Sequence, residues 1–91
     1  MPQSLFTLVC EFVGGTYISQ FQAADERQAI RDWASYLMVE QPMGAASTGI
    51  AACAQGDAEP PVAVTGLTGV WCWSELVEDD PVLVNIVRSA G

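Results

Sequence analysis

The stretch Ser4–Ala23, SLFTLVCEFVGGTYISQFQA, decides the fold. Every second residue in Phe6–Phe12 is apolar, which places these side chains on one face of a strand. A second alternating segment follows Gly14-Gly15, and two glycines between such segments favour a tight hairpin turn, because glycine tolerates positive φ. The predicted register pairs Phe12 with Tyr17, Cys10 with Ser19 and Leu8 with Phe21.

A helix is predicted directly after the hairpin. Asp25 can cap its first turn, and Gln28 three residues later completes a pattern similar to a capping box. Gln41-Pro42 ends the helix, because proline disfavours the helical conformation of the residue before it. Six apolar residues recur on one stripe, which we expect to pack on the hairpin: Ala29, Ile30, Trp33, Ala34, Leu37 and Met38.

The rest of the chain predicts three more strands, at residues 62–67, 69–77 and 82–89, with turns at Thr68-Gly69 and residues 78–81. Residues 43–61 are rich in alanine and glycine and form either a short helix at 50–55, stopped by Gly56, or an irregular segment. We therefore expect a single α+β domain over residues 1–91. It has an antiparallel sheet of about five strands in the order β-β-α-β-β-β and one main helix on one face.

The charge balance limits the partners of the chain. The 91 residues include 11 acids, three arginines and no lysine, and the net charge of −8 repels phosphate backbones and anionic lipid surfaces. Nucleic-acid and membrane partners are therefore not expected. Cys10, Cys53 and Cys72 form neither a disulfide framework nor a C-x-x-C motif. With no secretory signal pattern at the N-terminus, we expect a cytoplasmic protein.

The residue types present argue against an enzyme. The chain has no histidine and no lysine, which excludes histidine-dependent nucleophiles and Schiff-base chemistry. Gly44–Gly49 has the glycine spacing of a phosphate loop, but Ile50 stands where the lysine should be. The acids Glu75, Glu78, Asp79 and Asp80 lack the alternation of a calcium loop and indicate a solvated turn. No cofactor and no metal site are expected.

The second face of the sheet is the most informative feature for function. Its predicted residues are apolar too, and a single helix covers only one face. Either residues 43–61 or a second copy of the chain must cover it. Trp71 and Trp73 share one side of their strand, and both core burial and an interface are open for them. The candidate interface residues are Trp71, Trp73, Val9 and Ile18.

Arg27 and Arg31 form the one basic pair, a helical turn apart. Surface ion pairs with neighbouring acids are the favoured interpretation, and contact with an anion is the alternative.

The hairpin and the helix start Ala24-Asp-Glu-Arg-Gln-Ala-Ile30 resemble the first part of HicB-type antitoxins, over about a third of the chain. That resemblance implies a small basic toxin as partner. The residues themselves favour a non-enzymatic protein-binding or homo-oligomerising module, acting as a homodimer or with another protein. The alternative is a small-ligand-binding protein with its pocket between the sheet and residues 43–61.

Overall fold

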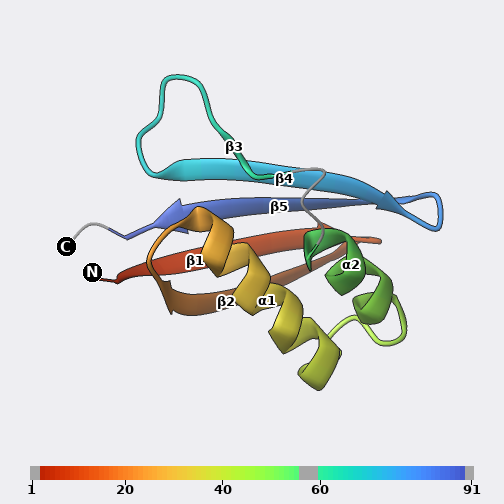
Figure 1. Cartoon of the computed structure of the whole chain (residues 1–91). Helices are drawn as coiled ribbons and strands as arrows, with labels where there is room; N and C mark the ends of the chain where they lie inside the picture. The colour runs from red at the N-terminus through yellow and green to blue at the C-terminus, as the bar shows by residue number, and fades with distance from the viewer. Residues whose placement is uncertain (1–2, 56–59, 90–91) are drawn as a thin grey trace.

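The opening hairpin forms as expected, but its turn lies one residue earlier. The computed structural model describes residues 3–55 and 60–89, and in it β1 (Ser4–Phe12) pairs with β2 (Gly15–Ala23) through the turn Val13-Gly14 (Figure 1). Both turn residues have positive φ, 46° and 76°. Gly15 belongs to the strand, where it pairs with Phe12, and the Tyr17 ring lies against it. A Cβ at this position would come within 2.9 Å of the Tyr17 hydroxyl.

The earlier turn corrects the predicted register by two residues. Phe12 pairs with Gly15, Cys10 with Tyr17 and Leu8 with Ser19. Because side chains alternate with a period of two, a shift of two residues leaves every side chain on its predicted face. The apolar face of the hairpin therefore survives the error in the turn.

The sheet has five antiparallel strands in the order β2-β1-β5-β4-β3. β4 (Val70–Val77) and β5 (Asp80–Arg88) join through the two-residue turn Glu78-Asp79, and β5 returns to pair with β1 in the centre. The predicted strand at 62–67 is reduced to β3 (Val62–Ala63), since the chain turns away through Gly66 at a φ of 84°. The two edge strands therefore differ in length: β2 has nine residues and β3 has two.

Helix α1 (Glu26–Glu40) confirms the predicted caps. The backbone N–H of Gln28 donates to Asp25 Oδ1 at 2.8 Å, and the backbone N–H of Ala24 donates to Gln28 Oε1 at 2.8 Å. The bond to Asp25 satisfies one of the backbone donors that the first helical turn leaves free, whereas Gln28 accepts from the residue before the N-cap and not from the N-cap itself, as a capping box would. The helix ends at Gln41, whose left-handed φ of 47° closes the last turn before Pro42.

Helix α2 (Ala46–Gln55) is longer than the predicted segment 50–55, and its predicted stop Gly56 lies outside the described residues. Ser47 Oγ accepts a hydrogen bond from the Met43 N–H at 3.0 Å, which satisfies the one buried polar side chain of this helix. Small residues let α2 approach the sheet closely. A Cβ at Gly49 would lie 3.0 Å from Val77 Cγ1.

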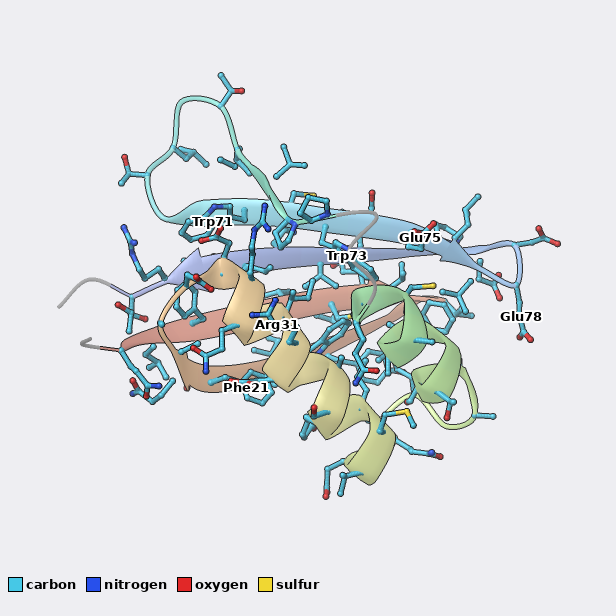
Figure 2. The ribbon with its side chains drawn as sticks, in the orientation of Figure 1. Phe21, Arg31, Trp71, Trp73, Glu75 and Glu78 are labelled. Carbon is cyan, nitrogen blue, oxygen red and sulfur yellow. The ribbon has the colours of Figure 1, made fainter. Side chains whose placement is uncertain are left out.

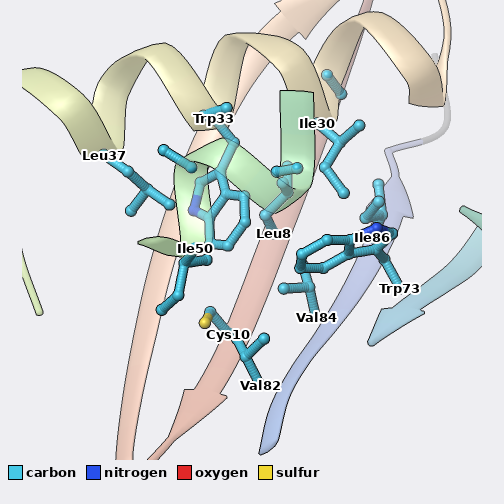
Figure 3. Close-up of a cluster of buried hydrophobic side chains, with 14 of the residues drawn as sticks. Leu8, Cys10, Ile30, Trp33, Leu37, Ile50, Trp73, Val82, Val84 and Ile86 are labelled. Carbon is cyan, nitrogen blue, oxygen red and sulfur yellow. The ribbon is translucent and has the colours of Figure 1, made fainter. Parts of the chain in front are cut away.

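Both helices pack on the same face of the sheet, and the core lies between the helices and the sheet (Figures 1 and 3). The stripe of α1 is buried as predicted except for Met38, which is 46% exposed because it lies beyond the edge of the contact. Trp33 and Ile50 meet the strands from the two helices. The buried residues of the long strands all come from one side of the sheet: Phe6, Leu8, Cys10, Phe12, Ala23, Trp73, Val77, Val82, Val84 and Ile86.

Candidate functional site

The side of the sheet turned away from both helices, here called the far face, is the candidate site. Alternation along the paired strands assigns its members. Its apolar side chains are Leu5, Val9, Ile18, Val62, Val70, Cys72, Leu76, Leu83 and Val87. No far-face residue of the described strands is buried, so this side is open to solvent in the single chain.

Several of these apolar side chains are strongly exposed. Ile18 is 65% exposed, Leu76 64%, and on the central strand β5 Leu83 and Val87 are 38% and 39% exposed. Val9 is half-buried and pairs with Ile18 on the neighbouring strand. Sequence reasoning named Val9 and Ile18 as interface candidates, and both lie on this face.

The far face carries almost no charge. Among the described strands, Glu11 is the single charged side chain on this side, and it lies near the end of β1 between Thr16 and Leu83. The polar members are neutral, and two of them are already paired. Gln20 Nε2 donates to Thr7 Oγ1 at 2.9 Å across β1 and β2. The acidic character of the chain is therefore concentrated elsewhere.

The two tryptophans lie on the opposite side of the sheet from Val9 and Ile18, so the four interface candidates do not share one surface. In Figure 2 both project from β4 on the side where the helices pack. Trp73 is 2% exposed, and its ring packs edge-to-face on Trp33 with centroids 6.2 Å apart. It is a core residue and not an interface residue.

Trp71 is half-buried at the margin of the core. Its ring lies 5.9 Å from that of Phe6, and the Arg88 guanidinium lies 5.7 Å from its centroid. These contacts cover Trp71 from within the chain, so the interface interpretation is not needed to explain its burial.

The segment proposed to cover the second face does not do so where it is described. Helix α2 packs beside α1 on the helix side, and its residues Ile50 and Ala51 are fully buried there. Ile50 and Ala51 therefore belong to the core, whereas Pro60 at the end of the segment lines an open pocket of about 320 Å³ beside Cys72 and Ser74 of β4. The far face remains without a cover from residues 43–55.

The charged candidates lie on the surface. Arg27 and Arg31 are exposed on α1, one turn apart as the spacing indicated. The acids Glu78, Asp79 and Asp80 are exposed at the β4–β5 turn, with Glu78 at its tip (Figure 2). Within residues 3–55 and 60–89, no group of three or more acids or cysteines is close enough to hold a metal ion.

Cys10 is unsuited to nucleophilic chemistry. Its side chain is fully buried, and burial, followed by the neighbouring Glu11 charge, raises the pKa of its thiol to about 11. The thiolate is the reactive form, so Cys10 stays protonated and inert near neutral pH. Its Sγ lies 4.0 Å from Met43 Sδ, inside the packed core.

Comparison with family models, with curated proteins and with solved structures finds no match for this chain. The described helices include none that is both long and apolar enough to cross a membrane. The geometry of the far face is therefore the evidence on which a functional proposal rests.

Proposed function

We propose that this protein is a non-enzymatic module that self-associates by packing the far face of its sheet against that of a second copy. The observation that carries the proposal is the open face of the central strands, where Leu83 and Val87 stay partly exposed with no covering element among the described residues. Contiguous exposed apolar surface in a soluble domain is typical of interaction sites.

The charge distribution favours a second copy over a basic partner. A basic protein would be drawn to acidic side chains, yet the far face offers Glu11 alone. Two copies meeting through this face bury little charge and keep their exposed acids outside the contact. Like-charge repulsion between two chains of net charge −8 then acts only over longer distances, where salt screens it.

The dimensions of the face limit the area that the contact can bury. Nine residues at ~3.3 Å each and four long strands at ~4.8 Å spacing give a flat area of about 570 Å². Stable interfaces bury about 800 Å² per partner, so this area corresponds to the low end of specific association. We therefore expect a reversible contact that depends on protein concentration.

The pair of variants Leu83→Lys and Val39→Lys tests the face directly. Leu83 lies on the central strand β5 of the far face, opposite Glu11 of β1, whereas Val39 is 77% exposed on the opposite layer, in α1. A lysine at position 83 must be desolvated in the contact, so we expect the average mass in light scattering to fall by a factor of about two. Val39→Lys adds the same charge and should keep the parental mass. Equal masses for the two variants would remove the far face as the contact.

Salt should strengthen the association. The Debye length falls from about 10 Å at 0.1 M to about 3 Å at 1 M ionic strength, which weakens repulsion between the acidic chains and leaves the apolar contact intact. Sedimentation at low and high sodium chloride measures this effect, and we expect a lower dissociation constant at high salt. A contact held by ion pairs, as with a basic partner, would instead weaken as salt rises.

A further inference from the structure

The outer edge of β2 is the second feature without a partner among residues 3–55 and 60–89. Residues 15–23 contain no charge and no proline, the two devices that most often protect an exposed edge strand. All nine residues of β2 are extended and pair with β1 on one side only. A long, uncharged, regular edge is a template for pairing with another strand.

The hydrogen-bond pattern identifies the backbone groups at this edge. Ser89 N donates to Leu5 O at 2.9 Å, so the odd residues of β1 direct their backbone groups to β5. The even residues of β1 then bond to the odd residues of β2. The residues of β2 that direct N–H and C=O groups outward are Thr16, Ile18, Gln20 and Gln22.

The opposite edge of the sheet is protected. The Val64 N–H donates to Val70 O, so the even residues of this segment bond to β4, and Pro61 stands at an outward position with no N–H to donate. Beyond the end of β3, β4 itself forms this edge, and there the Leu76 N–H donates to Glu75 Oε1 at 3.1 Å, which adds a charge to the edge. The contrast between the two edges indicates that β2 is left open for a partner.

We propose that β2 pairs antiparallel with β2 of a second copy about a two-fold axis at Ser19. This register aligns all nine residues, with Ile18 opposite Gln20 and Tyr17 opposite Phe21 of the other copy. Each copy supplies four outward residues, so the donors and acceptors are matched. A second copy is the occupant because the edge is uncharged in a strongly acidic chain and is complementary to itself under this symmetry.

A cavity of about 270 Å³ lies along the same edge, between β2 and α1. Thr16–Ser19 line one side of it, and Tyr36, Leu37 and Pro42 line the other. Phe21 of the second copy would enter the β2 side of this cavity beside Tyr17. The pairing is a contact separate from the far face, and it joins two sheets into one of ten strands. Two such sheets meeting through their far faces give four copies.

The test compares Gln20→Pro with Gln20→Ala. Both variants lose the side-chain hydrogen bond to Thr7, but only proline removes the outward N–H, which has no partner in the part of the chain that the structure describes. We expect Gln20→Pro to halve the mass in light scattering and Gln20→Ala to keep it. Gln22→Pro, which removes another outward N–H, should repeat the result if Gln20→Pro folds poorly. Equal masses for folded proline and alanine variants would overturn the pairing.

Amide hydrogen exchange separates this contact from the far-face contact. In Leu83→Lys, which removes the far-face contact, the paired edge predicts slow exchange for the amides of Ile18 and Gln20. Rapid exchange of both, beside slow exchange of Tyr17 and Ser19, would show a free edge and contradict the proposal. The double variant Leu83→Lys/Gln20→Pro should sediment as the 9.7 kDa chain. If Leu83→Lys alone is already monomeric, the edge proposal fails while the far-face proposal stands.

Discussion

Trp33→Ala is expected to destabilise the fold more than any other change considered. The Trp33 ring is 1% exposed and lies between α1 and the sheet, packed edge-to-face on Trp73 (Figure 3). Replacing a buried tryptophan by alanine removes its burial and leaves a cavity, which costs about 3–5 kcal/mol. For a chain of this length that loss lowers Tm by at least ~12 °C.

Urea unfolding at one fixed protein concentration measures this loss, because association also adds to the apparent stability. Trp71→Ala is the matched control, since Trp71 is only half-buried at the margin of the core and should cost clearly less. A Trp33→Ala variant that is as stable as Trp71→Ala would show that Trp33 is not central to the packing.

The second large effect is a loss of stability at alkaline pH caused by Cys10. Its pKa rises from 9.0 to about 11 on folding, first through burial and then through the Glu11 charge. Between pH 9 and 11 the unfolded thiol loses its proton while the folded thiol keeps it. The contribution of the protonated thiol to the free energy of unfolding is therefore fully present below pH 9. It is lost as the pH rises through 11, by up to about 3 kcal/mol.

Unfolding free energies at pH 8 to 11 for the parent and for Cys10→Ala measure this effect. The variant starts from lower stability because it leaves a small cavity, but its alkaline decline should be shallower. The exposed and half-buried ionisable groups are common to both proteins. The difference between the two unfolding free energies at each pH therefore reports the Cys10 thiol. Parallel curves would show that Cys10 ionises equally in the folded and unfolded chains.

The local signals in the sequence predicted the helix and the faces of the strands. The cap at Asp25 depends on residues within one turn of it, and the structure has this cap, with the Gln28 side chain bonded to the Ala24 N–H. The hairpin turn was wrong because the glycine pair was assigned to the turn as a unit. The Tyr17 ring lies against Gly15, and this contact is not visible in local propensities.

The candidate site could be predicted only in part. Val9 and Ile18 were assigned to the far face because alternation within one hairpin is local. The side on which Trp71 and Trp73 lie depends on how β4 pairs with β5 and how β5 pairs with β1, which are contacts between distant segments. The position of α2 beside α1 was equally out of reach, since its small residues suit either face of the sheet.

The central claim, that the uncovered far face with its single charge at Glu11 joins copies of this chain, is tested most directly by sedimentation equilibrium of the parent protein. The two contacts together predict a species of four times the 9.7 kDa chain mass at high concentration, dissociating on dilution. The far-face contact alone predicts a dimer, with twice the mass of one 9.7 kDa chain. A single 9.7 kDa species that persists into the millimolar range and at high salt would contradict the account.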